Sequence, residues 1–121
     1  MILRTLAAAL VAGALLTGCE TEKIEADSAH EQGAQLFNER CSGCHSLDAA
    51  AAQGSKPEGQ VSGGERTNGP NFNTRHVAKD DALFAIRNGG FSGAIMPANI
   101  VVGDDAERVA EFLDKYSGSG D

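Results

Sequence analysis

The apolar positions that precede the first pair of cysteines follow a helical spacing. Leu36 and Phe37 lie on a stretch that runs to the first of these cysteines. Ser28 stands three residues before Glu31, the pattern of a capping box at a helix N-terminus. The sequence therefore predicts a helix over about residues 29–41.

A second helix is predicted from about residue 80 or 81 to residue 88. Leu83 and Ile86 share one face, and acidic residues lie in the first turn, where the helix dipole favours them. Gly89 follows as the expected C-terminal cap.

A third helix is predicted to begin at Asp104, with Glu107 three residues later, and to stop at Gly118. Its apolar stripe consists of Ala106, Val109, Ala110, Leu113 and Tyr116. No alternating strand pattern of useful length occurs, so the sequence predicts an all-α domain. The connection over residues 46–68 is mostly loop, in which the alanines of residues 48–53 favour one or two helical turns.

The start of the chain has the layout of an export signal. Arg4 precedes an apolar run over residues 6–16, and small residues stand before Cys19. The uncharged stretch from Thr5 to Cys19 has fifteen residues. A helix that spans a bilayer needs about 20 apolar residues, so spanning is the weaker interpretation.

The sequence Leu16-Thr17-Gly18-Cys19 resembles the lipobox of bacterial lipoproteins. This resemblance implies that Cys19 is lipidated and becomes the new N-terminus, and the alternative is a plain cleaved signal in which Cys19 is incidental. We therefore expect a signal peptide over residues 1–18, a lipidated tether over 19–27 and one domain over 28–121. The protein is expected to be exported and held at a bacterial membrane, facing the periplasm or the cell exterior.

Charge and core composition narrow the function further. Residues 19–121 contain nine Lys and Arg against 17 Asp and Glu, a net charge of −8. Nucleic acid is therefore excluded as a partner, and a protein partner with a basic docking patch is favoured. Leu, Ile, Val and Phe number only 18 of these 103 residues, so something besides side chains must fill the core.

The sequence Cys41-Ser42-Gly43-Cys44-His45 is the C-x-x-C-H pattern of haem attachment. Two cysteines at this spacing can reach the two vinyl groups on one edge of a porphyrin, and the adjacent histidine can bind the iron. The pattern predicts one covalent haem c. A zinc site would need four ligands, and a thioredoxin-like pair would need a βαβ context that the sequence lacks. A disulfide that closes so short a loop would add little stability.

Over about residues 29–117 the chain resembles a class I cytochrome c of small bacterial type. The matching features occur in the family's order: Gly33 and Phe37 before Cys41, the attachment motif, Gly69-Pro70, and Met96-Pro97 before the last helix. The resemblance implies an all-α cytochrome c fold with three main helices around one covalently attached haem. It also implies that Gly33 and Phe37 meet Leu113 and Tyr116 where the first and last helices cross.

The resemblance implies a role for each of five site residues. Cys41 and Cys44 would form thioethers with the haem, and His45 would bind the iron through Nε2. The carbonyl of Pro70 would accept the Nδ1 proton of His45, and Met96 would bind the opposite face of the iron.

Two axial ligands leave no open site on the iron, so the resemblance implies a carrier of single electrons rather than an enzyme. Two alternatives stay open. Displacement of Met96 would give a small peroxidase or gas-binding site, and the chain could instead be a fixed haem subunit of a larger respiratory complex. The electron donor and acceptor are not identifiable from the sequence.

Several residues near these motifs carry weaker expectations. Arg66, Arg75 and Arg87 are candidates to pair with haem propionates, without preference for one. His76 is expected to be exposed rather than a ligand, and His30 to be solvated. The stretch over residues 49–66 resembles an insertion of unknown role.

Overall fold

A computed structural model describes residues 23–55, 68–90 and 95–119 of the chain. Outside these described residues lie the predicted signal segment 1–18, Cys19, residues 20–22 of the predicted tether, and residues 56–66 of the 49–66 stretch, which include Arg66.

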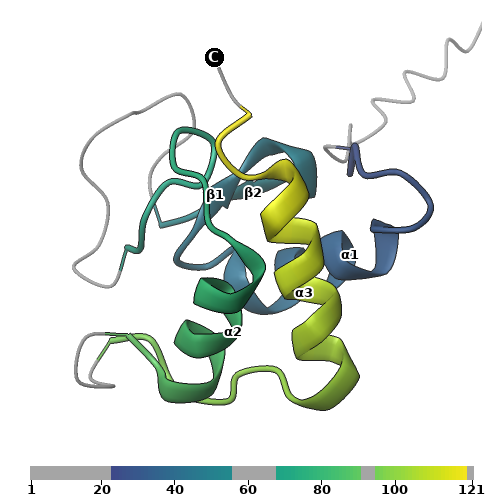
Figure 1. Ribbon diagram of the computed structural model, residues 1–121. Helices are drawn as coiled ribbons and strands as arrows, with labels where there is room; N and C mark the ends of the chain where they lie inside the picture. Colours follow the sequence, from purple (N-terminus) through teal and green to yellow (C-terminus); the bar gives the residue numbers. More distant parts are fainter. Residues whose placement is uncertain (1–22, 56–67, 91–94, 120–121) are drawn as a thin grey trace, which may run out of the picture.

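Three helices and one small strand pair form the described fold (Figure 1). In chain order these are α1 (Glu31–Cys41), β1 (Ser46–Leu47), a 3-10 turn (Asp48–Ala50), β2 (Ala52–Gln53), α2 (Lys79–Asn88) and α3 (Gly103–Tyr116). The strands pair antiparallel and contain two residues each, so the predicted all-α architecture is confirmed. The helical turn expected within residues 48–53 is the 3-10 turn between these strands.

Helix α3 packs against both other helices, and its crossing with α1 is close. A Cβ added to Gly33 of α1 would lie 2.3 Å from the backbone oxygen of Arg108 in α3. Beside this contact, the ring centroids of Phe37 and Phe112 are 6.0 Å apart, and both side chains are buried. Phe112 was missing from the predicted stripe, and it is the residue of α3 whose ring packs on Phe37. Tyr116 stacks on Phe112 at 5.1 Å.

The start of α1 differs from the predicted capping box. The helix begins at Glu31, its N-cap is His30, and no side chain caps it. Instead, the Asp27 carboxylate accepts hydrogen bonds from the backbone N–H groups of Ala29 and His30 at 3.0 and 3.1 Å. Ser28 is therefore not the cap, because the preceding carboxylate organises the turn.

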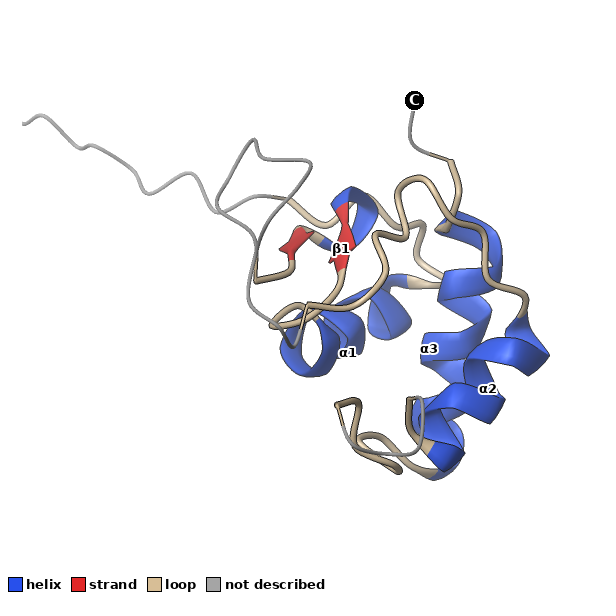
Figure 2. Cartoon of the chain, turned by 90° about the vertical axis from the view of Figure 1, so that its left-hand side faces the viewer, coloured by secondary structure: helices blue, strands red, loops and turns tan. Residues whose placement is uncertain are grey.

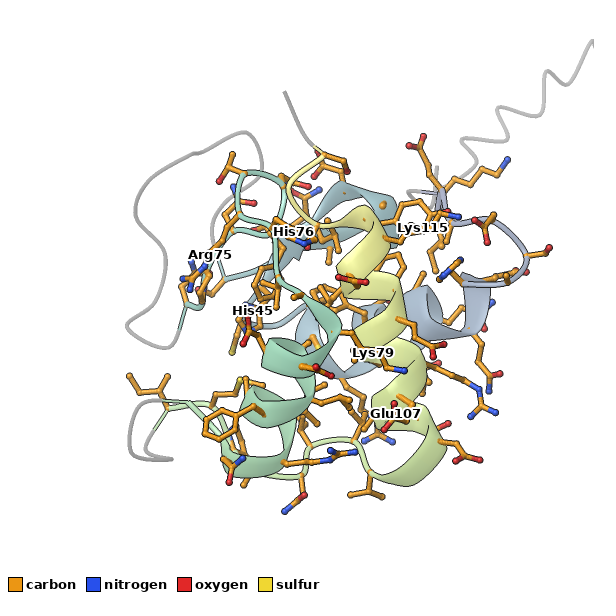
Figure 3. The ribbon with its side chains drawn as sticks, in the orientation of Figure 1. His45, Arg75, His76, Lys79, Glu107 and Lys115 are labelled. Atoms are coloured by element: carbon orange, nitrogen blue, oxygen red, sulfur yellow. The ribbon has the colours of Figure 1, made fainter. Side chains whose placement is uncertain are left out.

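The last residues of the predicted tether lie against the domain. Ile24 and Ala26 pack on the hydrophobic core. The backbone N–H of Asp27 donates to the Tyr116 hydroxyl at 2.8 Å, and the Asp27 carboxylate pairs with Lys115 (labelled in Figure 3). These contacts of Asp27 with Lys115 and Tyr116, called the clasp below, join the start of the domain to the end of α3.

Ion pairs join α2 to α3 on the solvent side. Lys79 Nζ lies 3.1 Å from Glu107 and 2.8 Å from Glu111. Figure 3 shows the side chain of Lys79, from α2, beside that of Glu107, from α3. At the other end of α2, Gly89 has a φ of 82° and its N–H bonds to the carbonyl of Ala85, which confirms the predicted C-cap.

Candidate functional site

His45 is held in one orientation by its surroundings. Its residue exposure is 9%, and its Nδ1 donates to the carbonyl oxygen of Pro70 at 3.0 Å. The ring stacks on Phe72 with centroids 4.6 Å apart and planes 13° from parallel. Because Nδ1 carries the proton, Nε2 holds the lone pair. Burial lowers the pKa of His45, and the bond to Pro70 opposes that shift, so the surroundings favour the neutral ring.

Gly69 lies directly against the His45 ring. A Cβ added at this position would lie 2.3 Å from Cε1 and 2.7 Å from Nδ1 of the ring. The Gly69 N–H also donates to the carbonyl of Cys44 at 2.7 Å. Any side chain at residue 69 would therefore displace the ring, which explains why glycine precedes Pro70.

The two cysteines of the motif stand where α1 ends. Cys41 is the last residue of the helix, and its carbonyl accepts the N–H groups of Cys44 and His45 at 3.1 and 2.9 Å. Both thiols are free. Burial, and to a smaller extent the neighbouring Cys44, raises the pKa of Cys41 to about 12. Because neither cysteine is in a disulfide, both are available to form thioether bonds.

Met96 comes from a separate segment, the loop between α2 and α3. The side chain is half-buried and packs against the core. The N–H of Gly90 donates to the carbonyl of Met96 at 3.1 Å, and the N–H of Asn99 donates to that of Ile86 at 2.6 Å. Residues 96–99 of this loop are thus bonded to the end of α2, and Figure 2 shows the tan part of the loop below α1 and beside α2.

Two free thiols, a neutral histidine with Nε2 available, and a half-buried thioether make a donor set that fits covalently attached haem. The structure brings Cys41, Cys44, His45 and Pro70 together, and the contact of His45 with Pro70 is the one that the family resemblance implied. Within the described residues, no group of three or more His, Cys, Asp and Glu side chains is placed to hold a metal ion.

The family model of cytochrome c matches residues 30–117. The chain belongs to the cytochrome c family. Among solved structures, the c-type cytochrome SorU from Sinorhizobium meliloti is similar to this cytochrome, with a TM-score of 0.57 and 27% sequence identity. The match covers 76% of this chain and 94% of that one. None of the curated proteins compared with the chain matches it.

These findings show three properties of the chain. It has the all-α cytochrome c fold, it binds haem c covalently, and it is a haem electron carrier. None of the helices in residues 23–55, 68–90 and 95–119 of this cytochrome is long and apolar enough to cross a membrane.

His76 of the cytochrome precedes α2 and lies beside the C-terminal end of α3 (Figure 3). Its side chain is 57% exposed, with Nε2 3.8 Å from Asp114. Its Nδ1 donates to the carbonyl of Ser117 at 3.3 Å. The expectation that His76 is exposed is therefore confirmed.

His30 is not simply solvated, contrary to the expectation from sequence. Its side chain is 22% exposed, and its Nδ1 lies 2.8 Å from the Asp27 carboxylate. The ring also meets the edge of Tyr116, with centroids 5.8 Å apart. His30 belongs to the clasp, because the Asp27 carboxylate draws it toward the end of α3.

The three arginine candidates for propionate pairing have different outcomes. Arg66 lies outside the described residues, and Arg75 is exposed. Arg87 pairs with Glu107 at 2.9 Å, which gives it a structural partner on α3.

Sequence reasoning missed two residues at the site. Phe72 stacks on the His45 ring, and its position just after Gly69-Pro70 was a usable signal. Asn68 bonds to Gly69 through its side chain at 3.2 Å. No local sequence pattern marks Asn68, because its other hydrogen-bond partner, Ser55, lies 13 residues earlier in the chain.

Proposed function

We propose that this cytochrome carries single electrons between redox partners and catalyses no reaction of its own. Haem attached at Cys41 and Cys44 supplies a reversible one-electron change of its iron. His45 would bind the iron of this haem through Nε2. The observation that carries this proposal is the 3.0 Å bond from His45 Nδ1 to Pro70, because it presents a fixed Nε2 lone pair.

Met96 is the proposed second axial ligand. It is the only methionine after residue 1, and its loop is tied to α2 by the bond from Gly90. A thioether is a soft donor that favours ferrous iron, so it raises the reduction potential relative to a second histidine. If His45 and Met96 both bind the iron, no position would be open for oxygen, peroxide or a substrate, which is why an electron carrier is favoured over an enzyme.

A visible spectrum of the protein made in a host able to attach haem c tests this assignment. We expect a low-spin spectrum and the weak long-wavelength ferric band typical of iron bound to methionine. The band should disappear in Met96→Ala and Met96→His. Met96→Ala should also bind cyanide faster than the wild type. His76→Ala, the matched control at an exposed histidine, should leave the spectrum unchanged. Absence of the band from the wild type would remove Met96 as the ligand.

We further propose that the protein works at the outer face of a bacterial membrane, held by a lipid on Cys19. The Leu16-Thr17-Gly18-Cys19 sequence supports this assignment. Cys19→Ser should move the protein from the membrane fraction to the soluble fraction. Retention of this variant on membranes after a high-salt wash would mean that another feature anchors the chain.

The charge of −8 over residues 19–121 supports redox partners with basic docking patches. A mobile carrier and a fixed subunit of a larger complex differ in how tightly they bind their protein partners. A pull-down from gently solubilised membranes at low and high salt distinguishes them. A mobile carrier should lose its partners as the salt concentration rises, and a fixed subunit should keep them.

A further inference from the structure

The side chain of Asn68 joins two segments beside the His45 site. Its Oδ1 accepts the backbone N–H and the hydroxyl of Ser55, both at 2.9 Å. Its Nδ2 donates to the carbonyl of Gly69 at 3.2 Å. A backbone N–H can only donate, so the amide oxygen must face Ser55 and the amide nitrogen must face Gly69. Both ends of the amide are therefore used, one on each segment.

The fold makes room for this amide. Gly54 has a φ of 70°, and a Cβ added there would lie 2.9 Å from Asn68 Oδ1 and 2.9 Å from Ser46 Oγ. A residue with a side chain at this position would be strained and would also push into the amide. Gly54 thus leaves space for Asn68, so the contact is part of a built arrangement.

The Pro70 carbonyl is fixed from both sides. Before it, Asn68 holds the Gly69 carbonyl. After it, the N–H of Phe72 donates to the Ser46 carbonyl in β1 at 2.9 Å. Pro70 itself has no N–H with which to anchor its own position. Loss of Asn68 would therefore remove one support of the carbonyl that accepts from His45. The bonds from the Gly69 N–H to Cys44 and from the Phe72 N–H to Ser46 would remain.

We infer that Asn68 is a positioning residue for the axial histidine, which it controls by holding Gly69-Pro70 against the ring. A strong bond from Nδ1 to a carbonyl makes imidazole a better electron donor, and a better donor stabilises ferric iron. A looser Pro70 carbonyl weakens that bond, so the reduction potential rises. The inference rests on the proposed role of His45 as ligand.

The test compares holoprotein variants that each lose side-chain hydrogen bonds. Asn68→Ala removes all three bonds of this amide, and Ser55→Ala removes the bond from the Ser55 hydroxyl to Asn68 while the backbone bond stays. Asn38→Ala is the matched control. This half-buried amide donates to the carbonyls of Ala50 and Ala51 at 2.9 and 3.0 Å and has no hydrogen bond to the 69–70 segment.

Two measurements separate positioning from general stability: the reduction potential, and the solvent exchange of the His45 Nδ1 proton by NMR of the reduced protein. In Asn68→Ala we expect a higher potential and faster exchange. Ser55→Ala should shift both in the same direction by less. Asn38→Ala should lower the melting temperature and leave both unchanged.

If Asn68→Ala changes only the melting temperature, or if Asn38→Ala shifts the potential equally, Asn68 is merely structural and the inference is overturned. If Asn68→Ala fails to fold, Ser55→Ala decides the question, and a wild-type potential and exchange rate in that variant would refute the role. The spectrum of the wild type tests the ligand assignment separately, so the two failures are distinguishable.

Discussion

Gly33→Ala tests the closest contact in the fold. The added Cβ would lie 2.3 Å from the Arg108 backbone oxygen and 2.9 Å from Phe112 Cβ, whereas ordinary contacts begin at 3.4 Å. Backbone atoms cannot rotate away as a side chain can. Helices α1 and α3 would therefore have to separate by roughly 1 Å, enough to forfeit a quarter to a half of each dispersion contact across the crossing.

The size of the effect follows from two opposing terms. Overpacking typically costs about 1–3 kcal/mol, and a backbone contact places Gly33→Ala at the upper end of this range. Alanine regains about 1 kcal/mol because it is the better helix former. The net loss of unfolding free energy is about 2 kcal/mol. In a domain of this size, 1 kcal/mol shifts the melting temperature by about 4–8 °C. The melting temperature of Gly33→Ala should therefore fall by about 8–16 °C.

Thermal unfolding of the holoprotein, followed by far-UV circular dichroism, measures this effect. The matched control is Glu39→Ala, a substitution at an exposed position of the same helix. We expect the control to stay within about 0.5 kcal/mol of the wild type. A melting temperature for Gly33→Ala equal to the wild type, with haem attachment intact, would refute the claim that this crossing requires glycine.

Two further perturbations test the clasp and the role of haem in the core. Bonds from Lys115 and then His30 lower the pKa of the Asp27 carboxylate, so its contribution to stability is present above the unfolded pKa of about 3.9 and is lost as pH falls toward the folded pKa. Asp27→Asn should therefore lower the melting temperature at neutral pH, with a gap to the wild type that closes in acid; an unchanged gap would contradict this. The double variant Cys41→Ala, Cys44→Ala should lose the cooperative thermal transition, because the 18 Leu, Ile, Val and Phe residues in 19–121 bury too little apolar area without haem. A wild-type transition in this variant would show that the polypeptide folds alone.

The parts of the site that the sequence predicts are local in the chain. Cys41, Cys44 and His45 lie within five residues, so their geometry follows from the end of one helix. The pairing of Pro70 with His45 came from the family resemblance, and the structure has it at 3.0 Å. The assignment of Met96 also came from the family resemblance, supported by the single methionine after residue 1, and it stays a prediction.

The parts that the sequence does not predict depend on partners far along the chain. The capping-box pattern favoured Ser28, but Asp27 organises the turn because Lys115 and Tyr116 meet its carboxylate across 88 and 89 residues. Phe112 did not enter the predicted stripe, although the close approach permitted by Gly33 puts it at the centre of the crossing. Local propensity carries no information about such neighbours.

The same distinction explains how the histidine is held. Gly69, Pro70 and Phe72, within four consecutive residues, all lie against the His45 ring. The contacts that fix residues 69–72, by contrast, depend on residues farther along the chain. Asn68 holds it from one side through Ser55, and β1 holds it from the other through a backbone bond that no side-chain pattern records. The ligand can therefore be predicted from a motif, whereas the stiffness of its support, which sets the donor strength of the imidazole, becomes apparent only in the folded chain.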